Sequence, residues 1–313
     1  MEYRHVGRSG LKVSSISLGA WLTYGGSEDK ATTLECIRAA VEHGINFIDL
    51  ADVYARGEAE RIVGEVIREL GLRRQDLVIS SKVFWPMSDN VNDRGLSRKH
   101  IMESVHNSLR RLQMDYLDLY FCHRFDPETP VDEVVRAMDD LVHQGKILYW
   151  GTSVWSAAQI EEAVGTARAL NAYLPQVEQP RYNLLDRRIE AEIIPTCARN
   201  GIGLVVWSPL AQGLLTGKYN AGIPEDSRAA RSRWLENDMT EENLNRVRRL
   251  TALAQEAGLT MSELALAWVL RRPEISSAIT GATKRAHVEA NVKAAEIKLS
   301  EDLLQQVEAI LKS

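Results

Sequence analysis

The stretch Leu117-Asp118-Leu119-Tyr120-Phe121-Cys122-His123 is short and mostly apolar, and it ends on a polar side chain. A run that is apolar on both faces is typical of a strand in a parallel sheet covered on both sides. Seven further runs share this character: Ser15–Ala20, Asn46–Leu50, Leu77–Lys82, Ile147–Thr152, Gln176–Gln179, Gly203–Ser208 and Ser276–Gly281. We therefore expect eight parallel strands.

The segments between these strands are predicted to be helices. In Glu58–Leu70 the apolar residues recur at helical spacing and form one stripe. The stretch Thr129–Asp132 predicts a threonine N-cap followed by a proline at the first helical position. Ser156–Gln159 and Thr260–Glu263 have the sequence of capping boxes, and Ser300–Leu311 is one more amphipathic helix after the last strand.

Eight strands, most of them followed by a helix, predict an α/β fold of the (β/α)8 TIM barrel type that occupies residues 1–313 as one domain. Tyr3–Val6 and Leu11–Val13 predict an N-terminal β-hairpin before the first barrel strand. Pro209–Asn237 is predicted to be a long loop after the seventh strand, and long loops inside compact domains are usually functional. A doubly wound open sheet is the alternative, but such a sheet normally carries GxGxxG after its first strand, and this sequence has none there.

The composition is that of an ordinary soluble globular protein. The chain is 45% hydrophobic and 26% charged, and 38 Lys+Arg against 43 Asp+Glu give a net charge of −5, which disfavours nucleic acid as a partner. The three cysteines lie far apart and support neither a disulfide framework nor a zinc ribbon. Because no signal peptide or membrane-length apolar run is visible, we expect a cytoplasmic protein without membrane insertion.

In a barrel of this kind the chemistry lies at the carboxyl ends of the strands. These ends carry Asp49, Lys82 and His123, and Tyr54 follows Asp49 in the next loop. A positioned phenol can protonate a carbonyl oxygen during hydride reduction, and an adjacent ammonium lowers the pKa of that phenol from its usual value of about 10. We therefore expect Tyr54 to be the general acid, aided by Lys82. Asp49 would hold Lys82, and His123 would orient the substrate oxygen.

Each of these residues also has an ordinary structural interpretation. Asp49 alone could cap a loop, Lys82 could be a structural ion-pair partner, and His123 could be a satisfied core histidine. Four complementary groups at one rim favour the functional interpretation. A metal hydrolase that uses Asp49 and His123 is a weaker hypothesis, since no HxxxH or HxH motif accompanies His123 and Lys82 would repel a cation. We predict no metal site.

The string Phe47-Ile48-Asp49-Leu50-Ala51-Asp52-Val53-Tyr54 resembles the Asp-x4-Tyr element of aldo-keto reductases, and Lys82 and His123 resemble the Lys and His of that family. The resemblance extends over essentially the full chain and is greatest to the branch of voltage-gated potassium channel β-subunits and their microbial relatives. Further matching strings are Tyr3–Gly10, Gly19–Trp21, Gly95–His100, Asp126–Pro130, Tyr149–Ser153 and Trp207–Leu210. Animal channel subunits resemble this chain but carry Asn in place of His123, so the retained imidazole favours a working reductase.

The resemblance implies an NADPH or NADP+ cofactor extended across the barrel mouth and a small carbonyl substrate. Besides Asp49, the implied cofactor contacts at the strand ends and in the long loop are Gly19, Ala20, Trp21, Ser153, Gln179, Trp207, Ser208, Pro209, Leu210, Gln212, Gly213, Lys218 and Arg228. After the eighth strand they are Gly281, Thr283, Lys284, His287 and Asn291.

Five of these positions have a physical rationale of their own. Trp207 offers a flat face for a nicotinamide, while Ser153 and Gln179 can bind its carboxamide. Thr283, Lys284 and the helix start after them form an anion site suited to a 2′-phosphate, which favours NADPH over NADH.

The substrate site is expected to be walled by Trp21, Tyr54, Trp85 and His123. Two residues depart from the pattern, since Val154 stands where many relatives have Asn or Arg, and His287 stands where the branch often has Gln. The resemblance also admits an alternative function, a regulatory or structural subunit that binds NADP(H) with little turnover. The channel-like branch forms tetramers, so a homotetramer is a further expectation.

Overall fold

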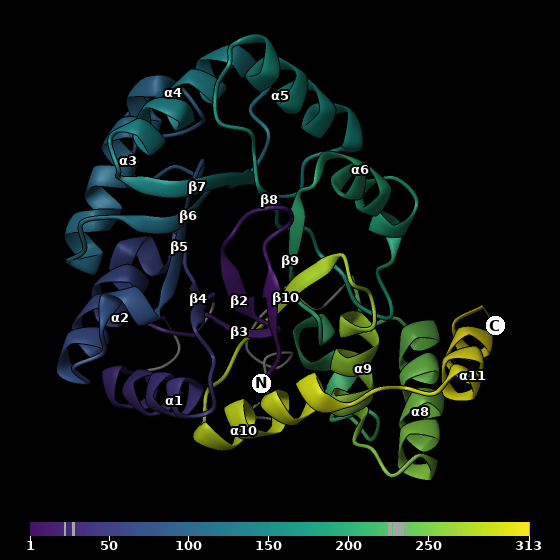
Figure 1. Cartoon of the computed structure of the whole chain (residues 1–313). Helices are drawn as coiled ribbons and strands as arrows, with labels where there is room; N and C mark the ends of the chain where they lie inside the picture. The colour runs from purple at the N-terminus through teal and green to yellow at the C-terminus, as the bar shows by residue number, and fades with distance from the viewer. Residues whose placement is uncertain (22, 27–28, 225–226, 228–234, 236, 313) are drawn as a thin grey trace.

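The computed structural model describes residues 1–21, 23–26, 29–224, 227, 235 and 237–312. Eight parallel strands close into a barrel in the order β10-β3-β4-β5-β6-β7-β8-β9, and the helices surround them (Figure 1). The barrel strands are β3 (Ile16–Gly19), β4 (Phe47–Asp49), β5 (Val78–Val83), β6 (Leu117–Cys122), β7 (Ile147–Thr152), β8 (Val177–Glu178), β9 (Gly203–Trp207) and β10 (Ile275–Thr280). The prediction of a (β/α)8 barrel is confirmed. The open-sheet alternative is wrong, because the last strand pairs with the first in parallel.

The α-helices are α1 (Lys30–Glu42), α2 (Glu58–Glu69), α3 (Arg98–Leu112), α4 (Val131–His143), α5 (Ala157–Ala169), α6 (Ile193–Asn200), α8 (Glu241–Glu256), α9 (Met261–Leu270), α10 (Arg285–Lys293) and α11 (Glu301–Lys312). Short 3-10 turns are η1 (Tyr54–Gly57), η2 (Arg74–Asp76), η3 (Arg188–Glu190), η4 (Ala211–Thr216) and η6 (Ala294–Glu296). In the described part of the chain, no helix combines the length and the apolar character that a membrane crossing requires.

The predicted N-terminal hairpin is confirmed as β1 (Tyr3–His5) paired antiparallel with β2 (Lys12–Ser14). It joins the barrel through Asn46, just before β4, whose side chain accepts a hydrogen bond of 2.7 Å from the Ser14 amide. Val6 and Val13 of the hairpin segment continue the apolar core inside the barrel, which consists of Phe47, Val78, Leu119, Phe121, Val177, Val205 and Ile279. The hairpin therefore packs against the start of the strands and leaves their carboxyl ends open.

The helix-start predictions have mixed outcomes. The capping boxes at Ser156 and Thr260 are both formed. The threonine N-cap at Thr129 is wrong, because α4 begins at Val131 with Pro130 as its N-cap and no side-chain cap. The Thr129 hydroxyl instead donates to Asp126 at 2.8 Å, since that carboxylate also organises the loop before the helix. The long loop after the seventh barrel strand carries the turn η4 in its described part.

Close contact between α2 and α3 depends on a glycine. A Cβ atom at Gly64 would lie 2.3 Å from the backbone oxygen of Leu112, whereas a Cβ at Gly165 in α5 would meet nothing within 4 Å. We expect Gly64→Ala to lower the free energy of unfolding by about 1–3 kcal/mol, because backbone would have to move in a closely packed layer. Urea denaturation followed by circular dichroism measures this change.

Gly165→Ala is the matched control, since it also replaces a helical glycine by alanine. Alanine is favoured over glycine in a helix by about 1 kcal/mol, so this variant is expected to be slightly more stable than the wild type. Equal effects of the two substitutions would show that the Gly64–Leu112 contact does not limit packing.

Candidate functional site

The centre of the site is an ion pair inside the barrel mouth. The Nζ atom of Lys82 lies 2.7 Å from Oδ2 of Asp49, 2.5 Å from the carbonyl oxygen of Leu50 and 3.2 Å from the hydroxyl of Tyr54. Lys82 is completely buried and Asp49 is 3% exposed. A buried ammonium requires such neighbours, because an unpaired charge in this environment is very costly. The structure thus brings together three of the four residues predicted to be catalytic.

The register of two neighbouring strands produces this contact. In the β4–β5 pair, Asp49 lies opposite Ser80, and Lys82 shares the face of Ser80 two residues further along β5. The Ser80 hydroxyl donates to Oδ1 of Asp49 at 2.7 Å. Tyr54 opens the turn η1, where Ala55 and Arg56 adopt positive φ angles of 49° and 54° and fold the chain back toward Lys82. Local backbone and strand register therefore place the phenol.

The predicted lowering of the Tyr54 pKa is wrong for the protein as described. Burial raises the pKa of Tyr54, Lys82 lowers it, and Asp49 raises it further, with a net increase above the ordinary value. For Lys82, burial favours the neutral amine, but Asp49 and Tyr54 outweigh that effect and raise its pKa. At neutral pH the site therefore holds a protonated phenol beside a protonated amine.

His123 follows β6 and lies beside Tyr54. The centres of the two rings are 5.9 Å apart at an interplanar angle of 76°. Burial, Lys82 and Arg124 lower the pKa of His123 well below its usual value, so the imidazole is neutral at physiological pH. Its Nδ1 atom is buried without a hydrogen-bond partner, which leaves Nε2 as the nitrogen available to a ligand. The fourth predicted catalytic residue thus joins the other three.

Aromatic side chains extend the site outward from His123. Trp85 meets the His123 ring edge-on at 6.4 Å and is 39% exposed. Trp21 meets Trp207 in the same way at 6.3 Å. Three of the four residues predicted to wall a substrate therefore form one group, Tyr54–His123–Trp85, and the fourth, Trp21, contacts Trp207, which was predicted to bind the cofactor.

Several predicted cofactor residues lie around Asp49. The side-chain amide of Gln179 donates to Oδ1 of Asp49 at 2.9 Å, and the Ser153 hydroxyl donates to the carbonyl oxygen of Gln179 at 2.9 Å. Gly19 pairs with Asp49 across β3 and β4, and the Ala20 amide donates to the Asp49 carbonyl. Asp49, at the end of β4, is thus a common partner of the ends of three other strands, β3, β5 and β8.

The loop after β9 has an unusual backbone. Ser208 and Gln212 have φ angles of 52° and 56°, and Gly213 has a φ angle of 101°. Pro209 is buried, and Leu210 immediately precedes η4. Lys218 is exposed and extends over Gly213, since a Cβ at Gly213 would lie 3.2 Å from its Nζ atom. A positive charge therefore lies over a strained loop, whereas Arg228, also predicted here, lies outside the described residues.

The predicted anion site lies at the start of α10. Gly281 and Lys284 are exposed, and Lys284 is the N-cap residue of the helix. The Thr283 hydroxyl lies 3.3 Å from Nδ1 of His287, and Asn291 is buried further along the helix. The neighbouring Arg285 is paired with Glu42 and Glu289, which neutralise its charge.

A buried carboxylate cluster behind β5 was not predicted as part of the site. Asp52 lies between Asp49 and Tyr54 and accepts a hydrogen bond of 2.9 Å from Ser104. Glu60 on α2 accepts hydrogen bonds from Ser81 at 2.5 Å and from Arg111 at 2.6 Å. Burial and the charge of Glu60 raise the pKa of Asp52 to about 7. The sequence contains a signal for this burial: Glu60 lies at helical spacing from the apolar Val63 and Ile67 and therefore on the helix face that packs against the barrel.

A second buried carboxylate, Glu178, also escaped prediction. It lies on β8 and accepts a hydrogen bond of 2.5 Å from the Thr152 hydroxyl. Burial raises its pKa to about 7. Val154, next to this pair, has a φ angle of 58°, which is strained for a β-branched residue.

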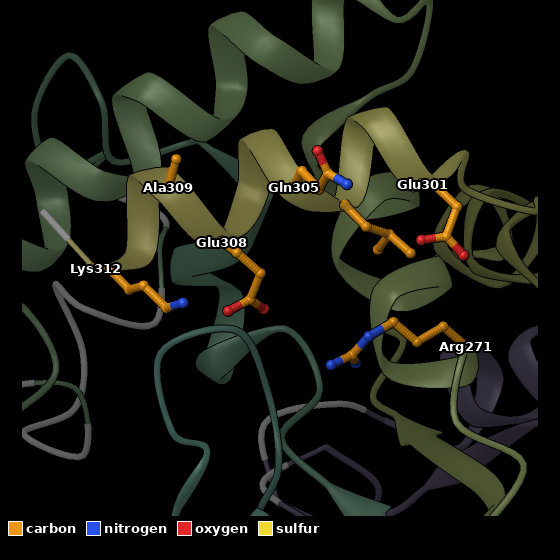
Figure 2. Close-up of a pocket in the computed structure, with 7 residues that line it drawn as sticks. Arg271, Glu301, Gln305, Glu308, Ala309 and Lys312 are labelled. Carbon is orange, nitrogen blue, oxygen red and sulfur yellow. The ribbon is translucent and has the colours of Figure 1, made fainter.

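The described residues also form a pocket away from the barrel mouth. This pocket outside the barrel is lined by Arg271, Glu301, Leu304, Gln305, Glu308, Ala309 and Lys312 (Figure 2). It contains none of the residues predicted for catalysis or cofactor binding. Within the described ranges, no group of three or more His, Cys, Asp or Glu side chains has an arrangement that could hold a metal ion.

Comparison with known proteins agrees with the fold. The family model described as "Aldo/keto reductase family" matches residues 15–312. A protein of Arabidopsis thaliana named "Probable voltage-gated potassium channel subunit beta" is 47% identical over 100% of this chain and 97% of its own length. A rice protein of the same name is 45% identical, with the same coverage of both chains.

The Asp52 cluster predicts a pH dependence of stability. Because the pKa of Asp52 is about 7 in the fold and 3.8 in the unfolded chain, its contribution is fully present below pH 3.8 and is lost as the pH rises through 7. Asp52→Asn keeps a neutral side chain at every pH. We expect this variant to be about 1–3 kcal/mol more stable than the wild type at pH 8 and similar to it at pH 4.

Urea denaturation across this pH range tests the expectation. Asp115→Asn, which removes an exposed carboxylate, is the control and should follow the wild type. Part of the pH dependence should persist in Asp52→Asn because Glu178 titrates in the same range. A pH profile identical to that of the wild type would mean that Asp52 is ionised in the fold.

Proposed function

The chain belongs to the aldo/keto reductase family, and on that premise we propose that it reduces aldehydes and ketones to alcohols with NADPH. The observation that carries the proposal is the buried group in which Lys82 contacts both Asp49 and the Tyr54 hydroxyl, with the neutral ring of His123 beside it. These groups can donate a proton and a hydrogen bond to one carbonyl oxygen.

NADPH, when bound, supplies the hydride that reduces the carbonyl carbon. His123 would donate a hydrogen bond from Nε2 to the carbonyl oxygen and hold it near Tyr54. Tyr54 would transfer its proton to that oxygen, which becomes the hydroxyl of the alcohol. Lys82 would stabilise the resulting phenolate, and Asp49 would keep Lys82 charged and in place. The raised pKa of Tyr54 keeps the phenol protonated at neutral pH, and the ammonium of Lys82, which lowers that pKa, favours release of the proton to the substrate oxygen.

The residues around the mouth fit a phosphorylated dinucleotide. Trp207 is partly exposed at the end of β9 and offers a face to a nicotinamide beside Gln179 and Ser153. The strained loop from Ser208 to Gly213, with Lys218 over it, suits a pyrophosphate. Lys284 makes no ion pair with any described residue, so its charge is available to a 2′-phosphate.

The names of the two plant relatives favour a second function, that of a cofactor-binding subunit of a potassium channel. In that case the chain would bind NADPH tightly and turn it over little. A carbonyl-dependent loss of absorbance at about 340 nm with purified protein distinguishes the two functions. The same preparation, examined by sedimentation, tests the proposed homotetramer.

The three buried free cysteines fit a reducing compartment, and we propose a cytoplasmic location.

Tyr54→Phe is expected to lower kcat for carbonyl reduction by about 10²–10⁴-fold, because only the proton donor is removed. NADPH affinity, measured by fluorescence titration, should remain near that of the wild type. Tyr173→Phe, which removes an exposed phenol on the surface, is the control for loss of a hydroxyl. A near wild-type kcat for Tyr54→Phe would refute the assignment of the general acid.

Lys284→Ala is expected to weaken NADPH binding about tenfold and to leave NADH binding nearly unchanged, since only NADPH carries the 2′-phosphate. The dissociation constants of the two cofactors, measured side by side, give the result. Lys298→Ala is the control, because this lysine is also exposed but lies beyond α10. Equal losses for both cofactors would argue against the 2′-phosphate role.

A further inference from the structure

Arg124 lies immediately after His123 at the open end of β6. Its side chain is partly buried, and its guanidinium lies 5.6 Å from the centre of the Trp85 ring. The same Trp85 ring contacts His123 edge-on. Arg124 therefore borders the same space as two residues that are expected to wall the substrate.

The guanidinium lacks the partner that arginines of similar burial have in this protein. Arg74, Arg111 and Arg181 are each paired with a carboxylate: Asp118, Glu60 and Asp238, respectively. Arg124 donates one hydrogen bond, to the carbonyl oxygen of its neighbour His123, and makes no ion pair with any residue that the structure describes. Buried or half-buried charges are normally paired, so the missing anion is the feature to explain.

The surroundings of Arg124 do not supply that anion. Asp49 is already bound to Lys82, and Tyr54 and His123 are neutral at physiological pH. Glu178 acts on Arg124 electrostatically, but its carboxylate is buried, accepts hydrogen bonds from Thr152 and the Trp155 amide, and has a pKa of about 7. Among the described residues, Glu178 is therefore only a partial counter-charge, and no carboxylate pairs with the Arg124 guanidinium beside the proton donor.

We propose that Arg124 binds an anionic group of the substrate, so that the preferred substrates are aldehydes or ketones bearing a carboxylate or phosphate a few bonds from the carbonyl. The planar guanidinium can hold two oxygens of such a group at once. The Trp85 ring beneath it would cover the atoms between the anion and the carbonyl. This inference rests on the proposed reductase function and specifies its substrate class.

The test compares matched substrates that differ in charge. The three positional isomers of carboxybenzaldehyde are assayed with NADPH against the corresponding methylbenzaldehydes, and glyceraldehyde 3-phosphate against glyceraldehyde. In the wild type, kcat/KM should favour at least one anionic member about tenfold to hundredfold. The pair that shows the preference distinguishes a carboxylate from a phosphate.

Arg124→Gln should abolish that preference, and Arg124→Lys should keep part of it, because lysine retains the charge but not the planar donor pair. The ratio within each substrate pair is compared between variants, which cancels the intrinsic effect of the substituent on carbonyl reactivity. Arg136→Gln, an exposed arginine of α4, is the control and should keep the wild-type ratio. A wild type without preference for any anionic member, or an Arg124→Gln variant that keeps the preference, overturns the inference.

A binding experiment tests the anion site independently of the reductase function. Benzoate and benzamide are titrated into the protein while tryptophan fluorescence is recorded. Benzoate should bind the wild type at least tenfold more tightly than benzamide, and Arg124→Gln should bind both alike. Absence of turnover on all carbonyls would refute the proposed function alone. Equal binding of benzoate and benzamide by the wild type would refute the anion site.

Discussion

The buried ion pair between Lys82 and Asp49 is the constraint on which the mouth of the barrel depends. An ammonium with no exposure to solvent must find its compensation within the fold, and here it finds a carboxylate, a carbonyl and a phenol. This requires the parallel register that sets Asp49 against Ser80, and it requires the closed barrel that holds that register. The side-chain amide of Gln179 donates to the same carboxylate, and the Ala20 amide donates to the backbone carbonyl of Asp49, so the ends of β8 and β3 are also tied to this residue.

Strand β5 separates two polar networks because successive side chains point to opposite faces. Ser80 and Lys82 contact Asp49 inside the barrel, while Ser81 contacts Glu60 in the helix layer. The outer network reaches α3 through Arg111 and the loop before Tyr54 through Asp52, whose backbone amide also bonds to the carbonyl of Lys82. The loop that carries the proton donor is therefore anchored from both sides of the barrel wall.

The sequence predicts the barrel and the strand-end residues well, because strand period and chain order decide both. The apolar runs that end at Asp49, Lys82 and His123 can be recognised without knowing how deeply any side chain is buried. The pKa of a side chain depends on how deeply it is buried, and the sequence does not reveal this burial. The raised pKa of Tyr54 follows from burial, which outweighs the neighbouring ammonium.

The sequence likewise does not show which charged and polar side chains contact each other in the fold. That no described carboxylate pairs with Arg124 can be recognised only when the three-dimensional positions of these carboxylates are known. Thr129 failed as a predicted cap for a related reason, since Asp126, three residues earlier, competes successfully for its hydroxyl. The protonation state of Asp52 likewise depends on Glu60, which lies on a different element.

Backbone strain is concentrated in the loops at the carboxyl ends of the barrel strands, around the buried Lys82–Asp49 ion pair. In the described chain, the non-glycine residues with positive φ are Ala55, Arg56, Gln113, Val154, Asn171, Ser208, Ala211 and Gln212. Two of them, Gln113 and Asn171, directly follow or lie just beyond helices α3 and α5, where such angles are common. The other six all follow the carboxyl ends of β4, β7 and β9. Residues with such strained φ angles persist only where the surrounding structure enforces them. The packed barrel therefore holds the loops at its mouth in backbone conformations that these residues rarely adopt.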